Sequence, residues 1–108
     1  MQIREYLDDQ GRSPFNRWFM RLDATAAARI VRVLARIEAG NLSDIKPLGG
    51  GILEKRIHTG PGYRIYFGRD GTDLVILLGG GTKRRQRHDI QQAKWRWMDY
   101  RQRKRGQS

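Results

Sequence analysis

Helical spacing of apolar residues dominates the first forty positions of the chain. Ser13 followed by Pro14 predicts a helix start, because the serine hydroxyl can accept a free backbone N–H and proline suits the first helical position. Asp23 is placed to cap a second helix, and Gly40 to end it in the left-handed conformation. One face of each helix is apolar, formed by Phe15, Trp18, Phe19 and Leu22 in the first and by Ile30, Val33, Leu34 and Ile37 in the second. We therefore predict a helical hairpin.

The pattern changes to a period of two after a loop expected at 41–51. Alternating and β-branched residues predict strands at 52–58, 63–68 and 74–78, joined by glycine-containing turns. The third strand is apolar throughout, which is typical of a strand covered on both faces, and is expected to stop at Gly79. A weaker alternation indicates a further short strand at 2–7.

A last helix is expected from Asp89, with its apolar positions at Ile90, Ala93, Trp97 and Tyr100. Together the elements predict an α+β fold, in which a helical hairpin and a C-terminal helix pack on a small antiparallel sheet. With 108 residues the chain has room for one domain, which we place at 1–100. The stretch 101–108 has no apolar anchor and is expected to be a frayed basic tail.

The register between the strands at 52–58 and 63–68 decides which side chains share a face. Pairing residue 58 with residue 63 sets Ile57 opposite Arg64, which mixes the apolar and polar faces. A shift by one residue sets Ile57 opposite Ile65 and separates the faces. This second register pairs Arg56 with Tyr66 and His58 with Arg64. It predicts one polar face that carries Arg56, His58, Arg64 and Tyr66.

The charge of the chain favours an anionic partner. There are 22 Lys and Arg against 11 Asp and Glu, a formal net charge of +11, and the sequence pI is about 11.1. Residues 83–108 contain ten of the basic and two of the acidic residues, so most of the excess lies in the last quarter. Such a field attracts nucleic acid above all.

Several classes of protein are disfavoured by what the chain lacks. There is no cysteine, which excludes disulfides and thiolate metal sites. The first 25 residues contain no long apolar run, so neither a signal peptide nor a membrane span is expected, and the cytoplasm is the expected location. His58 and His88 lie thirty positions apart with no neighbouring pair of carboxylates, so no metal or other cofactor is predicted.

RNA can be cut without a metal if a base takes the 2′-hydroxyl proton, an acid protonates the leaving 5′-oxygen, and cations stabilise the charge on the phosphorus. Arg64 is the first candidate for the phosphate clamp because its guanidinium is planar and always charged. A salt bridge between Arg64 and Glu54 is the plainer alternative. His58 and His88 could transfer protons or only donate to phosphate. Lys83 follows three glycines whose flexible backbone could approach a phosphate, and it could anchor the anion or act as a base.

Four segments of the chain resemble a known family: YLDDQGRSPFNRWF, the helical hairpin, LGGGILEKRIHTGPGYRIYF and GGGTKRRQRHDIQQAKWRWMDY. Their order and spacing are similar to those of the addiction-module killer proteins, the HigB-like branch of the RelE/ParE superfamily of type II toxins. The likeness covers about Tyr6 to Tyr100. It implies a RelE-like fold and a cognate antitoxin, expected to be a helix-turn-helix DNA-binding protein. It also implies a ribosome-dependent mRNA interferase, which is a metal-independent endoribonuclease that cuts mRNA by 2′-hydroxyl attack.

The resemblance also assigns site residues by position. The family's basic strand residues correspond to Arg56 and Arg64, with Tyr66 beside them, and its K-x-x-Q-x-x-D pattern corresponds to Lys83, Gln86 and Asp89. Catalytic roles are therefore expected among Arg64, Lys83, Arg56, His58 and Asp89. The third strand is expected to bring the segment 83–89 beside the hairpin at 53–67, so that the two together form the site. RNA or phosphate contacts are expected from Tyr66, Tyr63, Arg84, Arg85, Gln86, Arg87 and His88.

One departure from the family pattern is that Glu54-Lys55-Arg56 stands where an acidic-leucine-arginine sequence is usual, which puts the local packing in question. Relatives of similar fold poison gyrase. A gyrase inhibitor therefore stays open as an alternative, as does a non-catalytic module that binds RNA or the ribosome.

Overall fold

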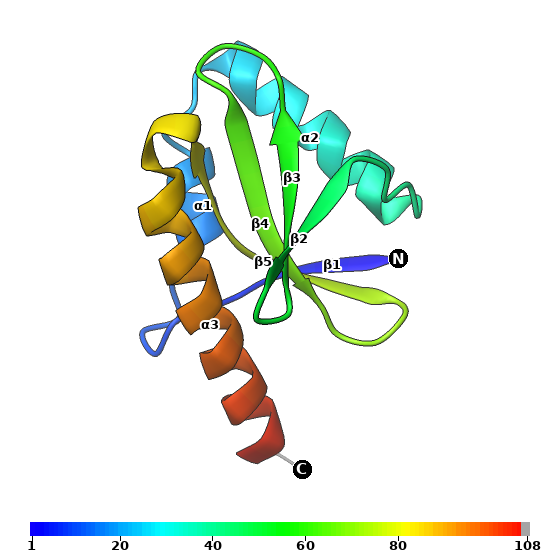
Figure 1. The fold of residues 1–108 in the computed structure, drawn as a ribbon, viewed down its shortest axis with the longest axis vertical. Coiled ribbons are helices and arrows are strands. Elements are labelled where there is room, and N and C mark those ends of the chain that lie inside the picture. The colour runs from blue at the N-terminus through cyan, green and yellow to red at the C-terminus, as the bar shows by residue number, and fades with distance from the viewer. Residues whose placement is uncertain (107–108) are drawn as a thin grey trace.

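A five-stranded sheet with the order β1-β5-β4-β3-β2 lies between helices on its two faces (Figure 1). The computed structural model describes residues 1–106. The strands are β1 (Gln2–Glu5), β2 (Ile45–Gly49), β3 (Ile52–Ile57), β4 (Tyr63–Arg69) and β5 (Leu74–Thr82). β1 runs parallel to β5, and the other neighbouring pairs are antiparallel. The α+β class is confirmed, but the sheet is mixed rather than purely antiparallel.

The helical hairpin covers one face of the sheet. α1 (Pro14–Phe19) and α2 (Ala24–Glu38) begin at the expected caps, since the Ser13 hydroxyl accepts from the Asn16 N–H at 3.0 Å and the Asp23 carboxylate from the Ala26 N–H at 2.8 Å. Gly40 has a φ of 90°, as predicted for the end of α2. The core on this side contains Phe15, Trp18, Ile30, Val33, Ile37, Ile57, Ile65, Phe67, Val75 and Leu77.

α3 (Gln86–Gly106) covers the opposite face, after a single 3-10 turn, η1 (Lys83–Arg85). The core on this side contains Tyr6, Ile52, Tyr66, Ile76 and Leu78, together with Ala93 and Trp97 of α3 itself. Val75 and Leu77 of β5 therefore point to the hairpin, while Ile76 and Leu78 point to α3. The prediction that this strand is covered on both faces is confirmed.

α3 is longer at both ends than the apolar spacing predicted. It begins at Gln86 rather than Asp89, and it continues through the stretch expected to be a frayed tail as far as Gly106. Lys104 anchors that end, because its ammonium group donates to Asp70 Oδ1 at 2.6 Å. Residues 107–108 lie outside the described residues. Within 1–106 no helix has both the length and the apolar character that crossing a membrane requires.

The triple glycine belongs to β5, which continues to Thr82 instead of stopping at Gly79. A Cβ on Gly80 would lie 2.2 Å from the Trp18 ring, and one on Gly81 would lie 1.9 Å from Asp89 Oδ2. These glycines let large or polar side chains lie directly on the strand, one on each face of the sheet. The expectation of a flexible, phosphate-approaching backbone is therefore wrong.

β2 occupies part of the segment that was expected to be a loop. It pairs antiparallel with β3 at the edge of the sheet, with Pro47 opposite Leu53. Proline cannot donate to a ladder and is tolerated on edge strands. The Lys55 side chain, which interrupts the usual family pattern, reaches the Ser43 carbonyl oxygen at 3.0 Å, so its charge is not buried without a partner.

Candidate functional site

The β3–β4 register sets Arg56 directly opposite Arg64 and Ile57 opposite Tyr63. The predicted pairs, Ile57 with Ile65, Arg56 with Tyr66 and His58 with Arg64, are therefore wrong by two residues. A slip of two keeps every side chain on its face, because side chains alternate with a period of two. The shift takes His58 out of the ladder and leaves it exposed in the turn.

Tyr63 occupies the opposite face from the two arginines. Its ring meets Trp18 of α1 edge-on, with 6.3 Å between the ring centroids. This packing stabilises the observed register, because it adds an aromatic pair to the core beneath the helical hairpin. Tyr63 therefore does not join the polar residues with which it was grouped as an RNA contact.

The polar face of β3 and β4 is buried against the start of α3. Arg64 is 6% exposed, and Glu54 and Tyr66 are 0% exposed. Glu54 lies between the two arginines: one oxygen accepts from Arg56 Nε at 2.7 Å, and the other lies 3.6 Å from Arg64 Nη1. The alternative interpretation of Arg64, a salt bridge with Glu54, is thus what the structure shows, in a buried rather than a surface setting. Tyr66 cannot reach RNA in this arrangement.

Asp89, in the first turn of α3, lies over the end of β5 next to Arg64. Arg64 pairs with Gly81 in the sheet, and the Asp89 carboxylate lies over that glycine. Burial raises the pKa of Asp89, against the lowering effect of Arg85 and His88. Burial, with Glu54 and Asp89 nearby, raises the pKa of Tyr66 to about 12.

Several buried polar atoms in this cluster lack a hydrogen-bond partner among residues 1–106. They are Arg64 Nε, Tyr66 Oη and Asp89 Oδ2, together with Glu54 Oε2 and Arg64 Nη1, which form an ion pair with each other at 3.6 Å but no hydrogen bond. An unsatisfied buried polar group typically costs about 1–3 kcal/mol, so such groups are rare in folded proteins. Their concentration at one end of the sheet is more typical of a functional site than of a structural core.

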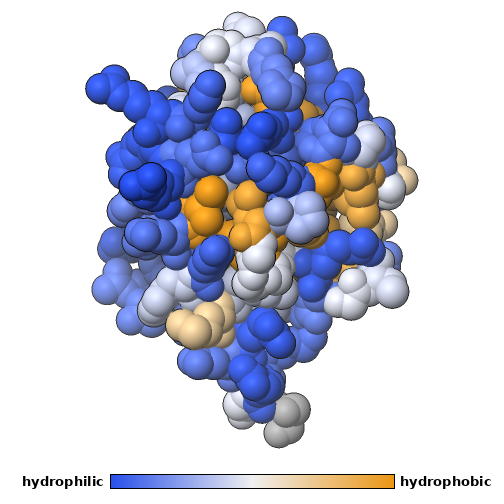
Figure 2. Space-filling model, in the orientation of Figure 1, coloured by the Kyte–Doolittle hydropathy of each residue, from blue (hydrophilic) through white to orange (hydrophobic). Residues whose placement is uncertain are grey.

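The exposed rim of the cluster is strongly basic. The backbone N–H of Lys83 donates to the Gly62 carbonyl oxygen at 3.0 Å, which ties the start of η1 to the β3–β4 turn. The predicted proximity of the hairpin and the segment 83–89 is therefore present. Exposed side chains of this rim are His58, Lys83, Arg84, Arg85, Arg87 and His88, with Gln86 partly buried among them. Figure 2 shows the α3 side of the molecule as mostly hydrophilic around a smaller central apolar area.

Two residues of the cluster were not among the predicted site residues. Glu54, named only as the alternative partner of Arg64, contacts both Arg56 and Arg64. Arg96 of α3 donates from Nη1 to the Leu78 carbonyl oxygen at 2.9 Å and lies against Gly79. Its role depends on how α3 docks, which no local pattern reveals. Within residues 1–106 no group of three or more Asp, Glu or His side chains is placed to hold a metal ion.

Residues 17–97 match the model of the family described as "Phage derived protein Gp49-like (DUF891)". The chain belongs to this family. It is a toxin-type family of addiction modules, in which a toxin is paired with an antitoxin. The matched range includes α2, the strands β2 to β5 and the basic rim, so the whole candidate site lies within the family region.

The chain is also similar to an uncharacterized protein of Haemophilus influenzae. The two are 44% identical over 81 residues, which cover 74% of this chain and 82% of the relative.

Proposed function

We propose that this protein is the toxin of a type II toxin–antitoxin module and that it cleaves mRNA on the ribosome. The observation that carries the proposal is the convergence of Arg56, Arg64 and Lys83 at one end of β3, β4 and β5, where the basic turn η1 begins. Cations held in advance at such a position can stabilise the charge that develops on a phosphate. In this proposal residues 1–100 form a RelE-like domain of the HigB-like branch, located in the cytoplasm.

The proposed reaction needs no metal. A base takes the proton of the 2′-hydroxyl, the resulting oxygen attacks the neighbouring phosphorus, and the bond from phosphorus to the 5′-oxygen breaks. An acid then protonates the 5′-oxygen, which leaves a 2′,3′-cyclic phosphate and a 5′-hydroxyl. Arg56 is the guanidinium best placed to contact the phosphate, since its side chain is 37% exposed, whereas that of Arg64 is 7% exposed.

Proton transfer is assigned to the exposed rim. His58 and Lys83 border the β3–β4 turn and are open to an incoming RNA. Asp89 lies deeper, and burial raises the pKa of its carboxyl group. In this arrangement Glu54 and Arg64 position Arg56 from below, while His58, Lys83 and Asp89 surround the scissile phosphate.

The cognate antitoxin is proposed to be a helix-turn-helix DNA-binding protein that keeps the toxin inactive. Expression of the toxin without it should arrest growth. Mapping of 5′ ends should then show mRNA cut within codons, and only in transcripts that are translated. An otherwise identical transcript without a start codon is the control.

The informative variant is Arg56→Ala with Lys83→Ala. Arg64→Ala is less useful, because Arg64 is buried under α3 and its truncation would leave a cavity beside Glu54. Arg56→Ala removes the closer partner of Glu54, so circular dichroism is used to check that this variant is folded. Arg29→Ala with Arg32→Ala removes the same charge from the exposed outer side of α2 and serves as the matched control. Full toxicity and cutting by the Arg56/Lys83 variant would exclude this site.

One observation favours a second candidate, a non-catalytic module that binds RNA or the ribosome. Arg64 and Tyr66 are buried under α3, so a substrate could contact Arg56 and the exposed rim but not these two side chains. This alternative predicts growth arrest with intact mRNA. Stalled gyrase–DNA complexes, again with intact mRNA, would instead indicate a gyrase inhibitor.

A further inference from the structure

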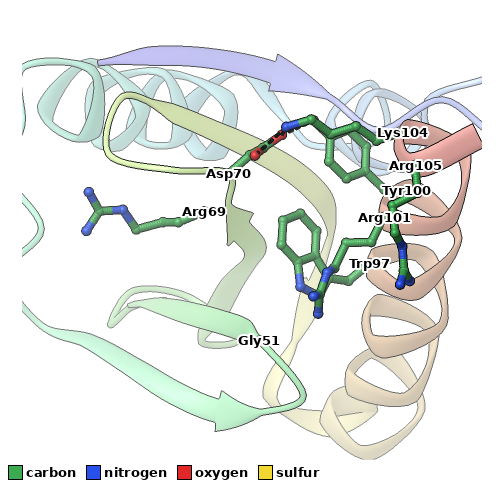
Figure 3. Close-up of a pocket in the computed structure, with 8 residues that line it drawn as sticks. All are labelled: Gly51, Arg69, Asp70, Trp97, Tyr100, Arg101, Lys104 and Arg105. Carbon is green, nitrogen blue, oxygen red and sulfur yellow. Dashed lines mark hydrogen bonds and ion pairs between the residues drawn. The ribbon is translucent and has the colours of Figure 1, made fainter. Parts of the chain in front are cut away.

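A second basic site lies at the far end of α3 from the candidate catalytic cluster. A cavity of about 440 Å³ opens between the C-terminal half of α3, the β2–β3 turn and the β4–β5 turn. Figure 3 shows the side chain of Arg101, which comes from α3, beside the Trp97 ring, while Arg69 of β4 directs its guanidinium away from that ring and donates to the Thr72 carbonyl oxygen at 3.2 Å. The cavity is large enough for a ribose and its phosphates.

The floor of the cavity is aromatic and held in a fixed position. The rings of Trp97 and Tyr100 are stacked, with centroids 5.3 Å apart and planes 6° from parallel. Trp97 lies directly against the sheet: a Cβ on Gly68 would be 2.5 Å from its ring, and one on Gly51 would be 2.5 Å from its Nε1. The floor therefore needs no rearrangement before a ligand binds, which lowers the cost of binding.

The rim of the cavity carries more basic than acidic side chains. Its basic residues are Arg69, Arg101, Lys104 and Arg105, and its acidic residue is Asp70. Asp70 accepts from both the Lys104 ammonium and the Tyr100 hydroxyl, the latter at 2.6 Å, so its carboxylate is fully engaged (Figure 3). Within residues 1–106 no carboxylate pairs with Arg69 or Arg101, both of which are exposed.

The cavity and the candidate catalytic cluster can contact one extended polyanion. Asp89 and Arg101 lie on the same helix, twelve positions apart, which corresponds to about 18 Å along its axis. One phosphate cannot bridge that distance, but a strand of several nucleotides can. Guanidinium groups that follow the phosphate backbone are also usual components of sites that hold single-stranded nucleic acid, and Trp97, which is only 6% exposed, forms the floor beneath them.

We propose that this cavity is a second RNA-binding site, in which Arg69 and Arg101 hold phosphates of the RNA backbone. The proposal rests on the proposed function, since it assigns the same class of ligand to the molecule. It adds an anchor away from the reacting phosphate, so it affects how tightly RNA binds and how RNA is aligned along α3.

The test compares Arg69→Ala/Arg101→Ala with the control pair Arg29→Ala/Arg32→Ala. The probe is a short fluorescent single-stranded RNA whose 2′-O-methyl groups block cleavage, so that binding is measured alone. Loss of two charge-assisted contacts should weaken binding by about tenfold or more. It should also reduce the slope of log affinity against log salt by about 1.4, since each single-strand phosphate contact contributes about 0.7. A helical RNA probe in a parallel titration shows whether mRNA or ribosomal RNA is the better ligand.

The outcomes separate this proposal from the proposed function. Equal binding by the two variant pairs would overturn the second site, even if the native protein cuts translated mRNA. Weaker binding by the Arg69/Arg101 variant alone would support it, even if no mRNA is cut and the proposed function fails. If that variant loses affinity for the purified antitoxin while RNA binding is unchanged, the cavity is a protein-docking site and the proposal is wrong.

Discussion

Glu54→Gln tests whether the buried carboxylate organises the two arginines of the site. Glu54 is fully buried, accepts from Arg56 Nε at 2.7 Å and lies 3.6 Å from Arg64 Nη1. Glutamine has nearly the same size and keeps one acceptor oxygen, so the substitution removes the charge and little else. Arg56 and Arg64, which are directly opposite in the ladder, would then face each other as like charges.

The expected loss is large compared with the stability of a small domain. Removing one partner of a buried ion pair costs about 3–5 kcal/mol. The glutamine of Glu54→Gln keeps one oxygen that can accept from Arg56, so the expected loss is about 3 kcal/mol, the lower end of that range. Domains of this size are stable by about 5–15 kcal/mol, so the variant should fold but unfold easily. With a urea slope of about 1–3 kcal/mol per molar, the unfolding midpoint should fall by roughly 1–3 M.

Urea unfolding followed by tryptophan fluorescence and circular dichroism measures this loss. Glu38→Gln, at an exposed glutamate near the end of α2, is the control and should leave the midpoint unchanged. The double variant Glu54→Leu/Arg64→Met removes both buried charges and should recover most of the loss, since apolar replacements of buried pairs are often neutral. A loss below about 1 kcal/mol for Glu54→Gln, or no recovery in the double variant, would refute the reasoning.

Three further predictions concern the fold. Gly80→Ala should lower stability by about 1–3 kcal/mol because its Cβ would meet Trp18, whereas Gly106→Ala, with no neighbouring atom within 4 Å, should not; equal melting temperatures would contradict this. Burial raises the pKa of Tyr6, Tyr66 and Tyr100 to about 12, so their stabilising effect should be present below about pH 10 and be lost as the pH rises toward 12. Ultraviolet titration of the native protein checks this, and ionisation of these three near pH 10 would argue against it. Hydrogen bonds from Lys104 and Tyr100 lower the pKa of Asp70, so that contact should stabilise the end of α3 above the ordinary aspartate range and be lost in acid. Lys104→Ala should reduce the loss of unfolding free energy that occurs as the pH falls through the aspartate range. An unchanged dependence of the unfolding free energy on pH would show that the contact contributes nothing.

Local signals predicted the elements whose cause is local. The caps at Ser13 and Asp23 and the apolar run of β5 each rest on a few neighbouring residues, and all three are present. β2 was missed because its pairing, not its composition, makes it a strand. The role of Gly80 was misjudged because it depends on Trp18, which is distant in sequence.

The same distinction between local causes and causes distant in sequence applies to the candidate site. The strand order predicted that the segment at Lys83 lies beside the β3–β4 turn, and the alternation placed Arg56 and Arg64 on one face. The exact register and the burial of that face could not be predicted, because they depend on the turn and on the docking of α3. The cost of leaving polar groups unpaired under a helix is a tertiary effect that no single strand reveals.

The most direct test of the central claim is the rate of mRNA cleavage on purified translating ribosomes. If the basic cluster at the end of β3, β4 and β5 performs the reaction, Arg56→Ala/Lys83→Ala should slow cutting by at least about a hundredfold, because each positioned group typically contributes 10²–10⁴-fold. The control Arg29→Ala/Arg32→Ala should cut at the native rate, and the products should carry 2′,3′-cyclic phosphate and 5′-hydroxyl ends. Equal cleavage rates for the two variant pairs, or no cleavage by the native protein, would contradict the claim.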